Sequence, residues 1–451
     1  MTALIEIDRE REKLTLNFHK GQRRALASTK RIVAIIAGGR SGKTSMAPYW
    51  LHREMLAKGP GDYLVAAPNY PLIDKAAGPE ISQYFGRLLG LGRLNRSPPQ
   101  QFVFSEEGCE KLWGLVPDRQ PRILFGHADE PESLEAMSAK AVWLDEAGQN
   151  RFRLGSWEAV QQRLSIDQGR ALITTKPYNL GWLKQLVFDP WEKAGRNHPD
   201  IDVFQFSSLM NPIFPKAEWD RAMASLPRWK FDMQYRGIFT KPAGLIYDCF
   251  DDATHRAPRF AVPPLWSRYL GLDFGGVNTA GVFLACEPES GRLYVYREYK
   301  AGSRTAREHK EALAQGEPGL PLTVGGSKGE GQWRDEFRAA GLPVREPAVS
   351  EVEVGIDRVY GAIKRGELVV MDHCTGLLDE LGSYSRAVDD AGNPTEKIEA
   401  KETYHHLDAL RYIVGWVKRG GRVIEVTAGR PTMAAGSRGG VFLNGDSERP
   451  W

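Results

Sequence analysis

The sequence predicts an α/β fold built on a parallel sheet with helices on both faces. Short apolar runs rich in β-branched residues recur along the first half of the chain, and stretches of helical character lie between several of them. The chain has 451 residues, which is more than one ordinary domain, so we expect two domains.

The first predicted sheet takes its strands from six apolar runs. The run at 32–36 is followed by a glycine-rich turn and a helical stretch at 44–56, and the run at 63–67 is stopped by Pro68. Residues 80–89 also look helical. The other runs expected to be strands are 102–104, 123–125, 141–144 and 171–174.

The second predicted sheet begins after a hinge at residues 241–244 (Lys-Pro-Ala-Gly), and further prolines extend a poorly periodic connection beyond it. The end of the chain, 420–451, is rich in glycine and small residues and is predicted to be a flexible tail. Strands are expected at 269–272, 281–286, 293–299 and 368–371, the second and third with hairpin-like spacing, and a helix is expected at 407–417.

Composition excludes some classes of protein and leaves others open. No run of about 18 apolar residues is present, so the sequence predicts no transmembrane helix. The four cysteines are far apart and form no CxxC pair, which fits a reducing compartment and gives no zinc signature. The net charge of +3 neither requires nor excludes nucleic acid, because positive charge can be confined to one groove.

Residues 37–44 (Ala-Gly-Gly-Arg-Ser-Gly-Lys-Thr) match a P-loop, with Ala37 in place of the first glycine. Lys43 is expected to reach the β- and γ-phosphates of ATP, and the Thr44 hydroxyl to bind Mg²⁺. A strand before the loop and a helix after it make a chance Gly-Lys-Thr turn a weak alternative. The small residues whose backbone N–H groups would wrap the phosphates are Gly39, Ser41 and Gly42.

Asp145 and Glu146 end an apolar strand about a hundred residues after the P-loop. The first carboxylate would lie beside the Mg²⁺, and the second would polarise the attacking water. Alone, the pair could equally be two solvated acids at a strand end. Together with the P-loop it predicts an ATPase site.

Three other residues have weaker signals, each with an alternative. Arg40 could stabilise charge on the transferred phosphate, or it could be a surface arginine or a DNA contact. Gln22 could contact the adenine edge, or it could be solvated. Thr175, with its neighbour Thr174, could sense the γ-phosphate, although threonines are common in strands.

At this point the chain resembles the large subunits of bacteriophage terminases, over roughly residues 15–417 and with the motifs in the right order. The P-loop and the acid pair would fit many ATPases, and the motifs around Asp273 and Asp408 make the match specific. The resemblance rests on the P-loop with its internal arginine, Asp145-Glu146-Ala147, and the segments at 66–70, 173–177, 208–212, 243–247, 271–275 and 405–412.

The resemblance implies a P-loop NTPase domain of the ASCE type followed by an RNase H-like α/β nuclease domain. We expect the ATPase domain at 1–240, the hinge at 241–264, the nuclease domain at 265–419 and the tail beyond it. It also implies that Gln22 contacts adenine, Thr175 couples hydrolysis to motion and Glu146 is the catalytic base. The family's loop arginine stands four residues before the lysine, whereas Arg40 stands three before Lys43, so its role stays open.

A nuclease of this kind gathers carboxylates around two divalent ions about 4 Å apart. Asp273, at the end of an apolar strand, and Asp408, at the start of a late helix, are the expected ligands of Mg²⁺ or Mn²⁺, and a histidine of the 405–406 pair could position Asp408. The strand that would precede the second carboxylate is followed by Gly325, Gly326 and Ser327. Glu330 is therefore the nearest candidate, and Glu298 is another.

As a terminase, the chain would translocate double-stranded DNA into the procapsid and cleave concatemeric DNA. The implied partners are the portal protein and a small terminase subunit. The chain would be a monomer in isolation and a ring, commonly of five subunits, on the portal. It would act in the host cytoplasm and be absent from the mature virion. A helicase-like, DNA-stimulated ATPase with a degenerate nuclease is the main alternative, and a non-catalytic DNA clamp is a second.

Overall fold

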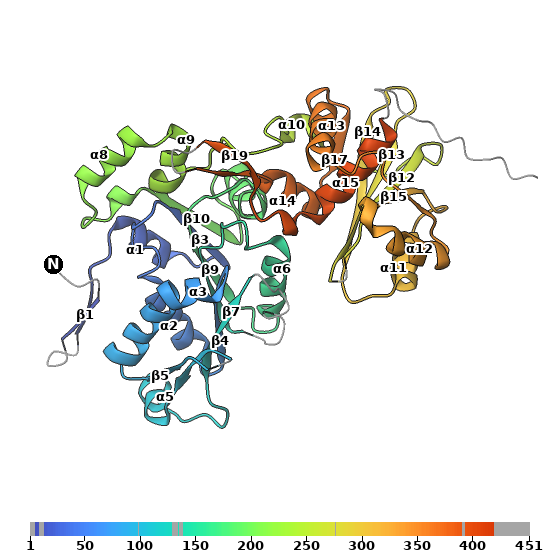
Figure 1. Cartoon of the computed structure of the whole chain (residues 1–451). Coiled ribbons are helices and arrows are strands. Elements are labelled where there is room, and N and C mark those ends of the chain that lie inside the picture. The colour runs from blue at the N-terminus through green and yellow to red at the C-terminus, as the bar shows by residue number, and fades with distance from the viewer. Residues whose placement is uncertain are drawn as a thin grey trace, which may run out of the picture.

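Two large sheets organise the molecule (Figure 1). The computed structural model describes residues 5–8, 13–97, 99–128, 134, 139–275, 277–389 and 393–418, so the predicted tail at 420–451 lies outside the described residues. Within the described part, no helix is both long and apolar enough to cross a membrane.

The first sheet has eight strands in the order β10-β3-β9-β8-β4-β7-β6-β5. The six strands from β10 to β7 are parallel, which confirms the predicted parallel sheet, and β6 and β5 extend it antiparallel at one edge. The strands are β3 (Ile32–Ala37), β4 (Asp62–Ala67), β5 (Gly92–Asn95), β6 (Gln101–Phe104), β7 (Arg122–His127), β8 (Ala141–Asp145), β9 (Arg170–Thr175) and β10 (Ile201–Phe206).

Helices cover both faces of this sheet because its central strands are apolar on both sides. In β3, Val33 and Ile35 enter one core with Trp50 of α2, while Ala34 and Ile36 enter the other core with Trp157 of α6. The helices of this half are α1 (Lys20–Ala27), α2 (Ala47–Lys58), α3 (Tyr70–Leu72), η1 (Ile73–Ala77), α4 (Gly78–Ile81), η2 (Ser82–Leu88), α5 (Glu106–Trp113), α6 (Leu154–Arg163), η4 (Leu183–Phe188) and α7 (Asp189–Lys193).

A helical segment and two small sheets flank the large sheets. Several of these short elements contact the P-loop or follow the hinge. They are β1 (Ile5–Asp8) with β2 (Lys13–Leu16), η5 (Ser208–Met210), α8 (Lys216–Ser225), α9 (Arg228–Phe231), η6 (Asp232–Arg236), α10 (Asp252–His255), and β18 (Arg386–Val388) with β19 (Pro394–Ile398).

The second sheet has seven strands in the order β11-β17-β14-β13-β12-β15-β16. β12, β13 and β14 form an antiparallel meander, as their spacing predicts, and β15 lies parallel to β12. The strands are β11 (Arg256–Ala257), β12 (Ser267–Asp273), β13 (Thr279–Cys286), β14 (Leu293–Ala301), β15 (Leu322–Gly325), β16 (Val344–Arg345) and β17 (Leu368–Met371).

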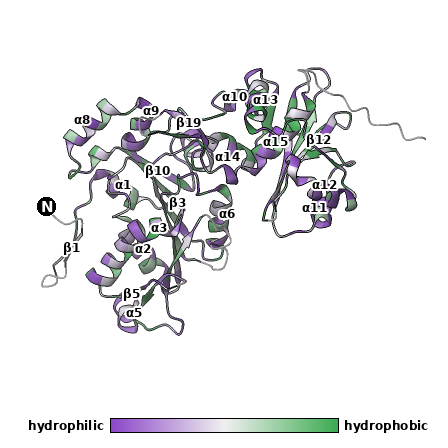
Figure 2. Cartoon of the chain, in the orientation of Figure 1, coloured by the Kyte–Doolittle hydropathy of each residue, from purple (hydrophilic) through white to green (hydrophobic). Residues whose placement is uncertain are grey.

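The second sheet also has helices on both faces. Leu270 and Leu272 of β12 pack with Phe337 of α12, whereas Tyr269 enters the core formed with α13, α14 and α15. Figure 2 shows largely apolar strands around β12 and many hydrophilic residues on α11 and α12. The helices are α11 (Ala306–Ala314), η7 (Lys328–Glu330), α12 (Gly331–Ala339), α13 (Val352–Lys364), α14 (Thr375–Ser383), η8 (Lys401–Thr403) and α15 (His405–Val417). The architecture is a P-loop NTPase sheet followed by an RNase H-like α/β fold, as predicted.

The segment that follows β9 joins the two halves through α14. Trp182 N donates to Asp379 Oδ1 at 2.6 Å, and Leu180 N donates to the Gly382 carbonyl at 2.9 Å. Arg153, at the start of α6, lies over the Tyr404 ring with its guanidinium carbon 4.1 Å from the ring centroid. The strand that ends at Thr175 is therefore connected, within a few residues, to the helices beside the second sheet. We call the part of the chain that carries the second sheet the nuclease-like half, after its predicted fold, and the part that carries the first sheet the ATPase-like half.

Candidate functional site

The P-loop leaves the end of β3 in a conformation that needs small residues. A Cβ on Gly38 would lie 2.1 Å from the Tyr235 carbonyl oxygen, and Gly42 has φ +84°. Gly39 N donates to the Gln234 carbonyl at 2.7 Å, so η6 closes over the start of the loop. Arg40 also has a positive φ, 57°, and its side chain is exposed.

The loop brings its last two residues to the end of β8. Lys43 Nζ lies 3.4 Å from Glu146 Oε1, and Thr44 Oγ1 donates to Asp145 Oδ1 at 3.1 Å. Hydroxyl and carboxylate oxygens are the ligands that Mg²⁺ prefers, so the donor set of Thr44 and Asp145 fits that ion. The four residues predicted from two distant motifs therefore lie together.

Asp145 is held from the other side by the neighbouring strand. Thr174 Oγ1 donates to Asp145 Oδ1 at 2.7 Å and accepts from Trp143 Nε1 at 2.7 Å. Burial, together with the negative charge of Glu146, raises the pKa of Asp145 to about 6, against the opposing effects of Thr174, Lys43 and Thr44. A cation bound beside Asp145 would favour its charged form.

Residues after β9 complete the cluster, and Tyr178 and Lys176 had no role predicted from the sequence. Tyr178 OH donates to Glu146 Oε2 at 2.8 Å. Lys176 lies close enough to Lys43, Arg40 and Glu146 to interact with their charges, and its pKa is lowered mainly by burial. Lys176 could have been singled out from the sequence, because it directly follows Thr175 in the Thr-Thr-Lys-Pro segment.

Thr175 is buried, and its hydroxyl is engaged by the loop that follows Glu146. Thr175 Oγ1 donates to the Lys176 carbonyl and accepts from Gly148 N, each at 2.9 Å. The hydroxyl thus ties the end of β9 to the segment just after the acid pair. That position is between the nucleotide cluster and the residues that contact α14.

Gln22 is fully buried, with both ends of its amide bonded to the protein. Its Oε1 accepts from His19 N at 3.0 Å, and its Nε2 donates to the Gly42 carbonyl at 2.8 Å. His19 itself reaches the loop, with Nε2 2.9 Å from the Ser41 carbonyl. The sequence predicted Gln22 on the adenine side of the site, and the structure places it against the phosphate loop.

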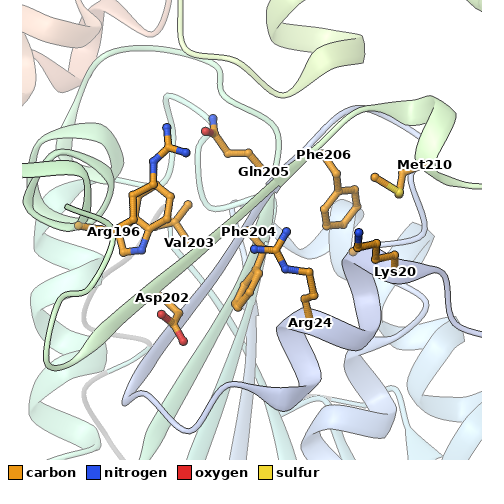
Figure 3. Close-up of a pocket in the computed structure, with 11 residues that line it drawn as sticks. Lys20, Arg24, Arg196, Asp202, Val203, Phe204, Gln205, Phe206 and Met210 are labelled. Carbon is orange, nitrogen blue, oxygen red and sulfur yellow. The ribbon is translucent and has the colours of Figure 1, made fainter. Parts of the chain in front are cut away.

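A cavity of about 350 Å³ lies on the other side of α1, along the edge strand β10 (Figure 3). Arg24 lies over the Phe204 ring, 5.9 Å from its centroid, and Lys20 and Phe206 line the same cavity. None of the residues predicted to bind nucleotide lines it. The cavity therefore adjoins the nucleotide site without belonging to it.

The predicted nuclease carboxylates approach each other where α15 packs against β12. Asp273 Oδ2 lies 2.9 Å from His405 Nδ1, and burial raises the pKa of Asp273, with the charges of Asp408 and Glu330 acting in the same direction and His405 opposing them. His405, Asp408 and Tyr412 share one face of α15 by their spacing. The charges of Asp273, Asp408 and Glu330 all act on the Tyr412 hydroxyl, whose pKa is raised mainly by burial.

Asp408 is paired with cations of the protein itself. Lys401 Nζ lies 2.7 and 2.6 Å from its two carboxylate oxygens, and Arg411 contacts it from the next turn of α15. Among the described residues, no group of three or more His, Cys, Asp or Glu side chains is arranged to hold a metal ion. In this arrangement the Asp408 carboxylate is therefore paired with Lys401 and Arg411.

The two candidates for the second carboxylate have different surroundings. Glu330 accepts from Ser327 N in a capping box, and its charge acts on Asp273. Glu298 holds the start of α14, because its two oxygens accept from Gly376 N and Leu377 N at 2.8 Å each. The charge of Glu330 thus acts on Asp273, whereas that of Glu298 acts on His406.

A larger cavity, of about 660 Å³, lies between the two halves of the chain, with Glu298 in its wall. Its walls combine acids and bases from α6, β14, α14 and the start of α15, with Glu158, Glu298, Lys300, His405 and His406 among the lining residues. Asp273, Asp408 and Glu330 do not line this cavity, but His405, which contacts Asp273, does.

Comparison with known proteins gives the following relatives. No family model matches the chain. Among solved structures, the large terminase of the thermophilic bacteriophage D6E is 17% identical, with a TM-score of 0.43, covering 89% of this chain and 100% of that one. The large terminase of bacteriophage HK97 is 14% identical, with a TM-score of 0.42, covering 89% and 95%.

Two curated proteins, each named as a terminase large subunit, are similar in sequence. The protein of Thermus phage G20c is 25% identical over 397 residues, which is 79% of this chain and 79% of that protein. The protein of Thermus virus P23-45 is 25% identical over 284 residues, or 57% of each chain. The chain is therefore similar in sequence to the curated terminase large subunits of two Thermus phages.

Proposed function

We propose that the chain is the ATP-driven motor that packages the genome of a tailed double-stranded DNA phage, and that it also cleaves concatemeric DNA. The observation that carries the motor proposal is the convergence of Lys43 and Thr44 with Asp145 and Glu146. A strand-end acid pair and a P-loop that meet in this way form the recurring core of ATP hydrolysis.

In the proposed ATPase reaction, Lys43 leaves Glu146 and binds the β- and γ-phosphates. Thr44 and Asp145 would hold Mg²⁺, which would supply positive charge beside the phosphates. Glu146, released from Lys43 but still held by Tyr178, orients and polarises the attacking water. The backbone N–H groups of Gly39, Ser41 and Gly42 complete the phosphate cradle.

Three further roles belong to the same proposal. Arg40 is exposed at the loop and suits either the transferred phosphate or a DNA phosphate. Thr175 couples the nucleotide site to the segment that contacts α14, because its hydroxyl joins both sides of that turn. Gln22 belongs to the nucleotide site through its bond to the P-loop.

For the second activity, we propose a metal-dependent endonuclease at Asp273 and Asp408, with Glu330 as the third acid. Support comes from the place of these residues, at the end of β12, on the facing turn of α15 and after β15. The oxygen donors suit Mg²⁺ or Mn²⁺. We place the ATPase domain at 1–240, the linker at 241–264 and the nuclease domain at 265–419.

The proposed partners follow from the resemblance of the motifs to those of terminase large subunits. They are double-stranded DNA, the portal protein and a small terminase subunit, with the chain monomeric alone and assembled as a ring, commonly of five subunits, on the portal. DNA contact is expected mainly through phosphates and to weaken strongly with salt. The chain would act in the host cytoplasm while docked on the procapsid.

The proposal is tested with the purified full chain in two assays run side by side. ATP turnover, with and without duplex DNA, is compared for wild type, Lys43→Ala and Glu146→Gln. Plasmid cleavage with Mg²⁺ or Mn²⁺ is compared for wild type, Asp273→Ala and Glu330→Ala. We expect turnover to vanish in the first two variants and cleavage in the last two, with each pair of variants retaining the other activity. Absence of ATP turnover in wild type would overturn the motor.

A second candidate is a motor whose nuclease is degenerate, and one observation favours it. Lys401 occupies both carboxylate oxygens of Asp408, so one of the two expected metal ligands is already neutralised. Wild-type turnover of ATP without plasmid cleavage in either metal would select this candidate.

A further inference from the structure

We propose that His19 is a positioning residue for the phosphate-binding loop, acting with Gln22 to orient the loop's backbone N–H groups toward the phosphates. The inference rests on the proposed ATP site. It assigns to the start of α1 a role in binding phosphate that is separate from recognition of the base.

Two side chains from one end of α1 hold two successive carbonyls of the loop. His19 Nε2 lies 2.9 Å from the Ser41 carbonyl oxygen, and Gln22 Nε2 donates to the Gly42 carbonyl oxygen at 2.8 Å. These carbonyls belong to the two peptide units that lead into Lys43. The contacts therefore fall on the part of the P-loop nearest the catalytic lysine.

The hydrogen bonds around His19 define which ring nitrogen carries the proton. Nδ1 accepts from Gly21 N at 3.1 Å and from Gln22 N at 3.4 Å, so it is unprotonated. The proton is then on Nε2, which makes Nε2 a donor to the Ser41 carbonyl. The Gln22 amide is fixed in the same way, because its Oε1 accepts from His19 N and leaves Nε2 for Gly42.

A trans peptide is planar, with its C=O and N–H pointing in opposite directions. Holding the Ser41 carbonyl toward α1 therefore points Gly42 N–H away from α1. Holding the Gly42 carbonyl in the same way fixes the direction of Lys43 N–H. Two of the donors that a P-loop presents to phosphate are thus oriented by side chains outside the loop.

The start of α1 is itself anchored to the strand beside the loop. The His19 ring packs edge-on against Phe206, with centroids 5.1 Å apart, and a Cβ on Gly21 would lie 2.7 Å from that same ring. Figure 3 shows Phe206 of β10 beside the start of α1. The Phe206 carbonyl also accepts from Gly38 N at 3.0 Å, so the start of the loop bonds to Phe206 directly. The end of the loop reaches the same residue through His19.

The test measures binding of ATP, GTP and base-free tripolyphosphate to the full chain, with Mg²⁺ present. His19→Asn is the informative variant, because asparagine can cap α1 as well as histidine does but is too short to reach Ser41. Gln22→Met removes the bond to Gly42. Lys20→Ala, an exposed neighbour in the same turn, is the control.

We expect His19→Asn and Gln22→Met each to weaken binding of all three ligands by a similar factor, about fivefold to tenfold, as befits the loss of one buried hydrogen bond. Lys20→Ala should bind as wild type does, and circular dichroism should show all variants folded. Weakened ATP binding with unchanged tripolyphosphate binding would overturn the inference in favour of contact with the base.

The inference would also be overturned if His19→Asn bound all three ligands as wild type does while His19→Ala did not, because the role would then be only to cap α1. Failure of wild type to bind either nucleotide or tripolyphosphate would instead count against the proposed ATP site itself. The two failures are therefore distinguishable.

Discussion

Tyr178 donates its hydroxyl hydrogen to Glu146 Oε2 at 2.8 Å, while the other oxygen of the same carboxylate faces Lys43 at 3.4 Å. Glu146 has a backbone φ of 53°, an uncommon value for a residue that is not glycine. The carboxylate proposed as the catalytic base is thus held by a partner that binds no phosphate. In the proposed reaction Lys43 turns to the nucleotide, and the bond from Tyr178 would still fix the direction of Glu146.

Tyr178→Phe is therefore expected to lower kcat for ATP hydrolysis by about fivefold to tenfold, with little change in KM, since the lost bond orients the base and does not contact the nucleotide. Glu146→Gln should lower kcat by about a hundredfold or more and leave ATP binding intact. Steady-state kinetics of the two variants and wild type check this. The role assigned to Tyr178 would be contradicted if Tyr178→Phe and Glu146→Gln lost kcat equally, or if Tyr178→Phe changed KM alone.

Lys401→Ala is expected to promote plasmid cleavage. The ammonium group of Lys401 contacts both oxygens of Asp408 and would compete there with the proposed divalent cation. Its removal should therefore lower the Mn²⁺ concentration for half-maximal cleavage by about tenfold, equivalent to about 1.4 kcal/mol. Lys397→Ala, on the exposed face of β19, is the matched control. If Lys401→Ala needs more metal than wild type, the lysine supports the site instead of blocking it.

Much of the fold could be predicted from local patterns in the sequence. The strands that carry the functional residues, β3, β8, β9 and β12, are apolar runs, and each begins and ends within one or two residues of its predicted bounds. β10 was not predicted, because Ile201–Phe206 mixes apolar and polar residues, as expected for the edge position it occupies. The first helix after the P-loop starts at Ala47 and not at residue 44, since the loop continues as turns up to that point.

The candidate site shows the same division between local and long-range information. Lys43, Thr44, Asp145 and Glu146 could be predicted because strand-loop-helix motifs specify their own geometry. The partners of those residues come from elsewhere in the chain: Tyr178 reaches Glu146 across 32 positions. No pattern within a strand or helix records that contact. The same holds for Lys401, whose pairing with Asp408 depends on the chain that enters α15.

Gly271→Ala is expected to destabilise the nuclease-like half by about 1–3 kcal/mol, as overpacking does. A Cβ at this position of β12 would lie 2.2 Å from the Ala409 carbonyl oxygen, which is helix backbone and cannot move alone. Gly319→Ala, where a Cβ meets nothing within 4 Å, is the control and should change stability by less than about 0.5 kcal/mol. Equal unfolding midpoints in denaturant for the two variants would show that α15 does not pack as closely as the structure indicates.

His406 and Glu380 form a buried pair that should make stability depend on pH. Glu380 oxygens accept from His406 Nδ1 and from Leu407 N at 2.9 Å each. Burial would lower the pKa of His406, but the charge of Glu380 and its hydrogen bond outweigh burial and raise it. In the same way burial would raise the pKa of Glu380, but His406, aided by Lys300 and Arg153, lowers it to about 2.

The sign of the pH dependence follows from the direction of each shift. Because the pKa of His406 is raised on folding, its contribution is complete below about pH 6.5, the value of a free histidine, and is lost as the pH rises through the folded pKa. The contribution of Glu380 is present above about pH 4.3 and is lost as the pH falls toward 2. The pair therefore stabilises most between these limits.

Denaturant unfolding of wild type and His406→Gln between pH 6 and pH 8.5 measures the alkaline side of this effect. Titration of the other histidines is common to both proteins, so the difference between their free energies of unfolding isolates His406. That difference should shrink as the pH rises. The total decrease is about 1.4 kcal/mol for each tenfold decrease that folding causes in the acid dissociation constant of His406. A difference that is constant or grows with pH would mean that His406 is neutral when it meets Glu380, and α15 would then be held at its start by neutral hydrogen bonds alone.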